Sequence, residues 1–117
     1  MLKLMVLLPK RADLSSEAFD RYLRETHVPL VARLPGLRRL VLNRVLPDPG
    51  GAPPAYDAIA EDWFDSPEAL QAALASPEGQ AVNADAPNLF DLARMQFFVV
   101  QEEDVALPAG QPPATAG

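Results

Sequence analysis

The sequence predicts an α+β fold in which a four-stranded antiparallel sheet carries its helices on one face, in the ferredoxin-like order βαββαβ. Three observations support this prediction. The apolar patterns along the chain run strand, helix, strand, strand, helix, strand. The first and last strands are apolar on both faces, as in a sheet that is covered on both sides. Only two helical regions are available, so they cover one face and leave the other for a second copy of the chain.

Residues 1–8, MLKLMVLL, form the first expected strand. Alternate side chains of an extended chain point to opposite faces of a sheet. Both sets are apolar here: Leu2, Leu4, Val6 and Leu8 on one face, and Met5 and Leu7 on the other. This strand is therefore expected at the centre of the sheet.

Residues 15–34 carry the first helical pattern, which starts with the hydroxyl N-cap Ser15 and the acid Glu17. Its apolar positions recur at helical spacing: Phe19, Leu23, Leu30 and Leu34. Pro29 lies inside the pattern and cannot donate a hydrogen bond to the carbonyl of Glu25. The helix should therefore bend or loosen around His27.

Two strands and a long connection follow. Residues 37–46 alternate apolar side chains and have charged ends, which suits an edge strand or a dimer contact. Residues 47–54 are rich in proline and glycine and predict a hairpin connection with a mobile tip. Residues 56–64 predict a third strand with two distinct faces: Asp57, Ile59, Glu61 and Trp63 on one, and Ala58, Ala60, Asp62 and Phe64 on the other.

The second helical region has two starts, because the sequence Ser-Pro-Glu occurs at residues 66–68 and again at residues 76–78. The second segment should end near Asp85, before Pro87. Residues 94–102 predict the fourth strand. We expect a single domain over residues 1–104 and a tail, residues 105–117, that is partly disordered because it is rich in proline, alanine and glycine.

Composition narrows the function classes. The net charge of -6 argues against nucleic acid or an anionic membrane as partner. The chain has no cysteine, no glycine-rich phosphate loop and a single histidine, so we expect no metal and no cofactor. No apolar run is long enough to span a bilayer. These features predict a soluble, cytoplasmic protein.

His27 is the main candidate for chemistry. A lone histidine beside an apolar helix stripe is more often a satisfied boundary residue than a catalyst. Pro29 frees backbone groups in the same turn, however, and such irregularities cluster at functional sites. The hypothesis makes His27 a general acid or base and Glu61 a second catalytic candidate. The residues expected to bind a ligand beside them are Tyr22, Asn43 and Trp63.

Four short stretches resemble the EthD family: THVPL at residues 26–30, LPG at residues 34–36, AEDWFDS at residues 60–66 and SPEG at residues 76–79. The family's His-x-Pro element corresponds to His27 and Pro29, and the resemblance covers about residues 1–102. It implies the dimeric α+β barrel fold, a homodimer, and kinship with muconolactone isomerases, polyketide cyclases and small antibiotic-biosynthesis monooxygenases. Asp62 departs from the apolar residue expected before the tryptophan.

The sequence leaves three functions open, of which the third is a purely structural dimer with a filled interior and no pocket. The first is an enzyme without a cofactor that isomerises, cyclises, dehydrates or oxygenates a small apolar or aromatic carbonyl compound in a degradative or secondary-metabolite pathway. The second is a non-catalytic protein that binds such a ligand or assists an oxygenase system. A pocket lined by His27, Trp63 and a carboxylate would favour the enzyme, whereas an apolar pocket without His27 would favour ligand binding.

Overall fold

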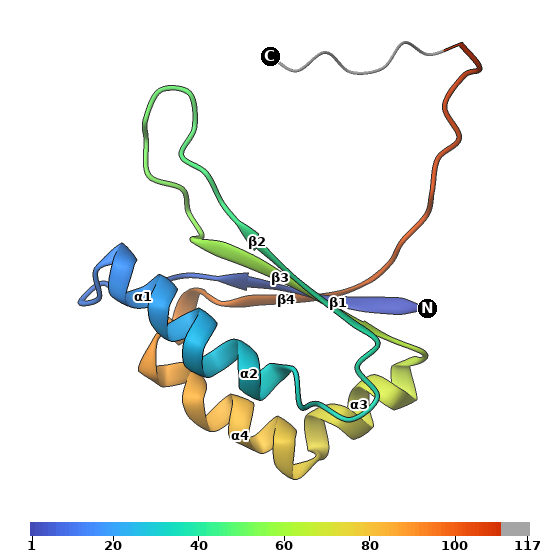
Figure 1. Cartoon of the computed structure of the whole chain (residues 1–117), viewed down its shortest axis with the longest axis horizontal. Helices are drawn as coiled ribbons and strands as arrows, with labels where there is room; N and C mark the ends of the chain where they lie inside the picture. Colours follow the sequence, from blue (N-terminus) through green and yellow to red (C-terminus); the bar gives the residue numbers. More distant parts are fainter. Residues whose placement is uncertain (111–117) are drawn as a thin grey trace.

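The structure, a computed structural model, describes residues 1–110 and has the predicted element order (Figure 1). The strands are β1 (Leu2–Leu8), β2 (Arg39–Arg44), β3 (Ala58–Phe64) and β4 (Gln96–Gln101). The first helical region consists of α1 (Ser16–Tyr22), a π-helical turn η1 (Leu23–His27) and α2 (Val28–Val31). The second consists of α3 (Pro67–Ala75), α4 (Pro77–Asp85) and the short 3₁₀ turns η2 (Ala86–Asn88) and η3 (Leu92–Arg94).

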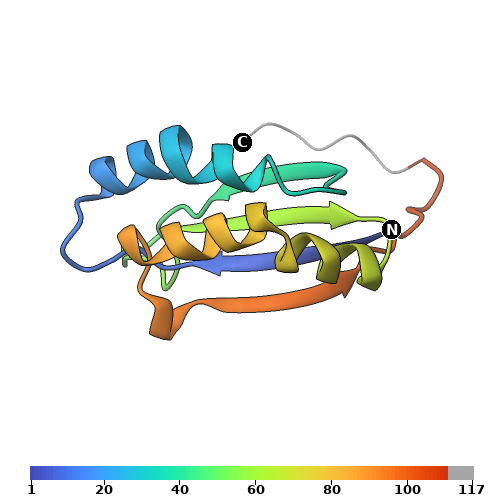
Figure 2. The same ribbon diagram turned by 90° about the horizontal axis from the view of Figure 1, so that it is seen from below.

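The four strands form one antiparallel sheet in the order β2-β3-β1-β4, so β1 lies inside the sheet and β2 at an edge, as predicted. All the helices lie on one face (Figure 2). The register places Asp62 opposite Leu4 on β1 and opposite Leu40 on β2. Side chains that are directly opposite one another share a face, and Leu4 is buried under the helices. The predicted faces of β1 and β3 are thereby confirmed.

The main hydrophobic core lies between the sheet and the helices. Phe64 and Leu4 contribute from the sheet, Leu23 from the first helical region, and Phe90 from the segment after α4. Ser66 and Ser76 cap α3 and α4 as predicted, since their hydroxyl oxygens accept hydrogen bonds from the backbone N–H groups of Ala69 and Gly79. α4 ends at Asp85, which is also where the sequence placed its end.

The strand boundaries are shorter than predicted. β4 begins at Gln96 instead of residue 94, because residues 92–94 form η3 and lead into the strand. β2 covers residues 39–44 of the predicted 37–46, because its partner β3 is only seven residues long. The pairing of β2 with β3 continues just beyond the ends of β2. There the N–H of Arg38 donates to the carbonyl of Trp63, and the N–H of Val45 donates to the carbonyl of Asp57.

Two segments extend away from the sheet (Figure 1). The first is the connection between β2 and β3, which has no regular structure between residues 45 and 57. The second is the chain after β4, where residues 102–110 contain no helix or strand. The predicted tail begins at residue 105, and its residues 111–117 lie outside the described part of the chain.

The face of the sheet away from the helices carries both apolar and charged side chains. Phe98 lies on this face, opposite Met5, and is 48% exposed. β4 is also poorly covered on its other side, where Phe97, opposite Val6, is 59% exposed. A single chain therefore leaves large apolar side chains of β4 in contact with water.

Candidate functional site

The turn that carries His27 is irregular, as the position of Pro29 predicts. In η1 the backbone N–H of Val28 donates to the carbonyl of Leu23, five residues earlier instead of four. Pro29 has no N–H, so the carbonyl of Glu25 loses its usual helical donor. Single π-turns inside helices occur frequently at functional sites. The local sequence thus produces a widened turn, with His27 as its last residue.

His27 lies under the helices, and its side chain is held from two directions. The residue is only 5% exposed. Its Nδ1 atom lies 2.9 Å from Oδ2 of Asp85, the last residue of α4. The rings of His27 and Phe90 make an edge-to-face contact, with their centroids 5.0 Å apart and their planes at 89°. These contacts fix the orientation of the imidazole.

Asp85 binds three donors. The hydroxyl of Tyr22 donates to Oδ1 at 2.5 Å, the amide nitrogen of Asn88 donates to Oδ1 at 3.0 Å, and His27 engages Oδ2. Burial by itself raises the pKa of this carboxyl, but the hydrogen bonds from Tyr22, His27 and Asn88 outweigh burial and hold the pKa below its usual value. Asp85 is therefore a carboxylate at neutral pH.

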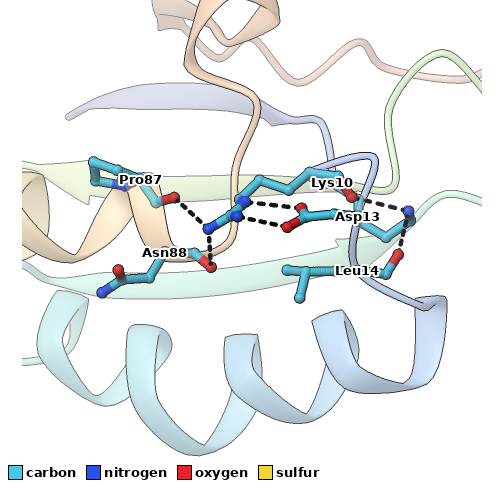
Figure 3. A network of polar contacts seen from close by, with 6 residues as sticks. Lys10, Asp13, Leu14, Pro87 and Asn88 are labelled. Carbon is cyan, nitrogen blue, oxygen red and sulfur yellow. Dashed lines mark hydrogen bonds and ion pairs between the residues drawn. The ribbon is translucent and has the colours of Figure 1, made fainter.

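The segment after Asp85 is anchored to the turn between β1 and α1 (Figure 3). Arg11 is central to this anchor: its side chain donates to the carbonyls of Pro87 and Asn88 at 3.2 and 3.4 Å and pairs with Asp13 at 2.6 Å. Its backbone N–H also donates to the carbonyl of Leu89 at 3.0 Å. These contacts join the turn before α1 to the segment just after α4, and so they help to fix the position of Asp85 relative to His27.

This arrangement determines which nitrogen of His27 can react. A carboxylate can only accept hydrogen bonds, so Nδ1 must carry the proton that it shares with Asp85. In the neutral ring Nε2 is then unprotonated and can accept a proton from a ligand. The carboxylate also stabilises the imidazolium that forms, as in other histidine–carboxylate pairs.

A cavity of about 320 Å³ lies between the sheet and the helices, and His27 is part of its wall. The wall is mostly apolar and includes Leu4, Val31 and Met95. Its most exposed apolar members are Leu74, Leu92 and Phe97, which mark the mouth beside β4. The size lies at the lower end of the range for small-molecule pockets.

Asp62 also lines this cavity, from the floor formed by β3. The residue is 4% exposed, and its Oδ1 atom has no hydrogen-bond partner within the described part of the chain. Burial raises the pKa of Asp62 to about 6. The pocket therefore combines His27 and a carboxylate, but this carboxylate is Asp62 and not Glu61.

The predicted site residues fall into two groups on opposite faces of the sheet. Tyr22 lies with His27, through their shared partner Asp85. Glu61 and Asn43 lie on the open face, where Glu61 accepts hydrogen bonds from Lys3 at 2.8 Å and from Asn43 at 3.2 Å. The bond from Lys3, more than any other contact, lowers the pKa of Glu61. Within one chain these residues do not share a pocket with His27.

Trp63 shares the open face and is not part of the cavity wall. Its ring lies between two cations: Nζ of Lys3 is 5.0 Å from the ring centroid and the guanidinium carbon of Arg39 is 4.6 Å from it. Through such cation–π contacts the two charged side chains cover the indole ring, which therefore needs no apolar side chain packed against it. The expected grouping of His27 with Trp63 is therefore not found within the chain.

Asp85 is the site residue that sequence reasoning missed. The sequence pattern indicates only that a helix ends at this residue. One signal was present, because an acid in the last turn of a helix is unfavourable next to the negative end of the helix dipole. Such a residue needs compensating donors, and Tyr22, His27 and Asn88 supply them.

Within residues 1–110, no group of three or more histidine, cysteine, aspartate and glutamate side chains is placed to hold a metal ion. In the same range no helix is both long and apolar enough to cross a membrane.

The sheet topology and the pocket under the helices define a small α+β protein of the ferredoxin-like class. Residues 11–93 match the EthD domain, and the chain belongs to the EthD family. A relative from Rhodococcus erythropolis, an uncharacterized 11.0 kDa protein in the thcB-thcC intergenic region, is 35% identical over 91 residues, which are 78% of this chain and 85% of that protein. The resemblance in residues 26–30 and 60–66 thus identified the family correctly.

Solved structures agree with this assignment. An EthD family protein from Bacillus halodurans is 30% identical, covers 88% of this chain and 99% of its own, and has a TM-score of 0.73. SnoaB, a cofactor-independent oxygenase from Streptomyces nogalater, is 13% identical, with 89% and 94% covered and a TM-score of 0.63. A dimeric protein with a ferredoxin-like fold from Bacteroides fragilis is 17% identical, with 85% and 91% covered and a TM-score of 0.59. At these identities the last two show the fold alone.

Proposed function

We propose that this EthD protein is a cofactor-independent acid/base catalyst acting on a small apolar or aromatic carbonyl compound in the cavity under the helices. The observation that carries the proposal is the His27–Asp85 pair, which presents a correctly protonated imidazole to an apolar cavity. A buried carboxylate that orients and supports a histidine is the arrangement by which proteins make a general base.

The first step would be proton transfer from carbon to nitrogen. Nε2 of His27 takes a proton from the carbon next to the substrate carbonyl, the C–H electron pair forms a carbon–carbon double bond, and the carbonyl π electrons move to oxygen, which gives an enolate. In a substrate with a conjugated double bond, the imidazolium returns the proton to the γ carbon, which gives isomerisation. In a cyclisation the enolate carbon adds to a second carbonyl group of the substrate, and the imidazolium protonates the alkoxide that forms. In a dehydration the enolate expels a β-hydroxyl group, which leaves as water with the proton from the imidazolium. In an oxygenation O₂ is both co-substrate and oxidant: it adds to the enolate carbon to give a hydroperoxide, which loses water and leaves one oxygen atom as a new carbonyl group. The apolar wall favours neutral, ring-containing substrates.

The proposal can be tested without knowing the natural substrate. 2-Tetralone is an aromatic ketone with acidic C–H groups next to its carbonyl, and it has two fused rings. In D₂O, proton NMR follows the loss of these hydrogens. We expect the protein to accelerate the exchange with saturation in ketone concentration. Exchange at the rate of buffer alone, with ketone shown to bind, would exclude acid/base catalysis on this class of compound.

The alternative is a ligand-binding or accessory protein for an oxygenase system. The observation that favours it is the composition of the cavity, whose wall is apolar over most of its surface and opens beside β4. Binding of 2-tetralone without any accelerated exchange would support this alternative.

Pro29→Ala is expected to reduce the exchange rate several-fold while changing stability by less than about 1 kcal/mol. The alanine N–H can donate to the carbonyl of Glu25, which tightens η1 and shifts His27 away from Asp85. Stability changes little because the regained hydrogen bond is offset by greater freedom of the unfolded chain. NMR exchange and thermal unfolding measure the two effects. An unchanged exchange rate would show that the widened turn does not matter for function.

We further propose that the protein is a homodimer in which the open sheet faces pack together. Phe98 and Met5 lie on this face, opposite one another in the pairing of β1 with β4. The helices all lie on the other face of the sheet (Figure 2). Burying such side chains contributes about 25 cal/mol per Å² of apolar area removed from water. The fold likeness to a protein that is itself dimeric is consistent with this arrangement.

Sedimentation at micromolar concentration should therefore give about 25 kDa, twice the 12.7 kDa of one chain. Phe98→Asp should convert the protein to a monomer, because a charge would be buried without a partner at the interface. Leu46→Asp is the matched control, since Leu46 is 72% exposed in the β2–β3 connection. A monomer in the unmodified protein would contradict the proposed interface.

A further inference from the structure

The mechanism proposed above makes no use of Asp62, although this residue is one of the least exposed in the cavity wall. It is one of two titratable side chains in that wall, the other being His27. Its neighbours across the sheet, Leu4 and Leu40, are apolar and offer no hydrogen bond from their side chains. Burying an unpaired carboxyl group destabilises a protein by several kcal/mol. A residue that is costly to the fold and points into a pocket is a candidate for binding.

We propose that Asp62 accepts a hydrogen bond from a hydroxyl group of the ligand, so that the cavity takes small apolar ring compounds that bear a phenolic or enolic hydroxyl. Asp62 can have this role only if the same cavity holds the substrate, so the proposal rests on the proposed function. It adds a specific substrate class: a hydroxyl group at the β3 floor, and the reacting carbon next to His27.

The unpartnered oxygen defines the kind of group that fits. A carboxylate oxygen only accepts, so its partner must be a donor. An amine would bind as an ammonium ion, which adds the cost of removing a second charge from water into an apolar cavity. A neutral hydroxyl has no such cost and still forms a charge-assisted hydrogen bond with the carboxylate. The rest of the wall then contacts the apolar ring.

Selectivity for the hydroxyl should be large. A site that holds a buried polar group rejects an analogue that cannot pair with it, because the group then remains unpaired when water is displaced. We expect at least a tenfold preference for a ligand with a hydroxyl over the same ligand with a methoxy group. The methoxy oxygen can accept a hydrogen bond but cannot donate one.

The experiment compares three probes with one ring system, 2-naphthol, 2-methoxynaphthalene and 2-naphthylmethylamine, by isothermal titration calorimetry at pH 7.5. The unmodified protein should bind 2-naphthol at least tenfold more tightly than the other two. Asp62→Leu should abolish this preference and bind 2-methoxynaphthalene more tightly than the unmodified protein does. Arg21→Gln is the matched control, which should keep the preference because Arg21 is exposed on α1 and is not part of the cavity wall.

A titration at pH 5 gives an independent reading. Burial raises the pKa of Asp62 to about 6, so at pH 5 the carboxyl is mostly protonated and can itself donate to the methoxy oxygen. The preference for 2-naphthol should shrink there. Asp62→Leu should show no such change between pH 7.5 and pH 5 if Asp62 is the cause.

Each remaining outcome overturns the proposal in a different way. Equal affinity for 2-naphthol and 2-methoxynaphthalene at pH 7.5 would show that water satisfies Asp62, and would leave the acid/base function intact. Tighter binding of the amine would make Asp62 a cation site. No binding of any probe would overturn both the hydroxyl proposal and the proposed cavity. A preference that persists in Asp62→Leu would assign the hydroxyl to another residue.

Discussion

His27→Gln is expected to reduce the exchange of 2-tetralone hydrogens by a factor of roughly one hundred or more, the usual contribution of a positioned general base. Glutamine has about the size of histidine, and its amide NH₂ group can still donate to Asp85, which would otherwise lose one of its three donors. It cannot take up a proton near neutral pH. The effect should therefore appear in the rate and only weakly in the stability of the fold.

Arg21→Gln is the matched control for this variant, since Arg21 lies in α1 with its side chain exposed. It should keep the full exchange rate. Asp85→Asn should reduce the rate as well, because asparagine can donate to Nδ1 and so favour the tautomer whose Nε2 carries the proton. A His27→Gln protein with a lowered melting temperature and an unchanged rate per folded molecule would assign His27 a structural role. It would also favour the ligand-binding alternative.

Asp62→Asn is expected to increase the free energy of unfolding by about 3 kcal/mol at pH 7.5 and by little at pH 4. The carboxyl has a pKa of about 6 in the folded protein, whereas the ordinary value for an aspartate is 3.8. Between these values the folded state holds more protons than the unfolded state, so stability falls as pH rises through this window. Each pKa unit corresponds to about 1.4 kcal/mol. Asparagine has the same shape and no charge, so it avoids this loss.

Urea unfolding at pH 4 and at pH 7.5 measures the difference. Asp85→Asn is the matched control, for which we expect the opposite change in stability. The pKa of Asp85 is lowered in the folded state, so its carboxylate stabilises the fold above the unfolded pKa. This stabilisation is lost as pH falls through the folded pKa. The Asp85 variant should thus be less stable than the unmodified protein at pH 7.5. An Asp62→Asn protein that is also less stable at pH 7.5 would mean that Asp62 has a partner in solution.

The fold was predictable because its signals are local and repeated. Two Ser-Pro-Glu starts gave α3 and α4 their first residues, and strict alternation along residues 56–64 assigned each side chain of β3 to a face. A one-residue slip would turn every side chain to the wrong face, so a clear alternation leaves little freedom. The irregular turn near His27 was predictable for a similar reason, since a missing N–H at Pro29 affects a known carbonyl.

The site was only half predictable because its parts come from distant segments. His27 and Asp85 are 58 residues apart, and nothing in either neighbourhood specifies the other. Glu61 and Asp62, in contrast, are adjacent in the sequence but lie on opposite faces of the sheet. Both are acids on one strand, and the expectation favoured Glu61, whereas Asp62 is the one that faces the helices and the cavity. The alternating pattern already assigned Glu61 and Asp62 to different faces of β3. It did not reveal that Lys3 forms an ion pair with Glu61 on the open face.

The widened turn η1 also bears on how this helix can vary in length. A hydrogen bond that spans five residues instead of four accommodates one extra residue in an otherwise regular helix, which makes a π-turn the structural equivalent of a single-residue insertion. Deleting one residue between Leu23 and His27 would let α1 and α2 join as one continuous α-helix with both apolar stripes still on the sheet. The imidazole would then follow the regular helical path. In a comparison of EthD chains, a one-residue gap at this point would therefore separate proteins with this histidine geometry from those without it.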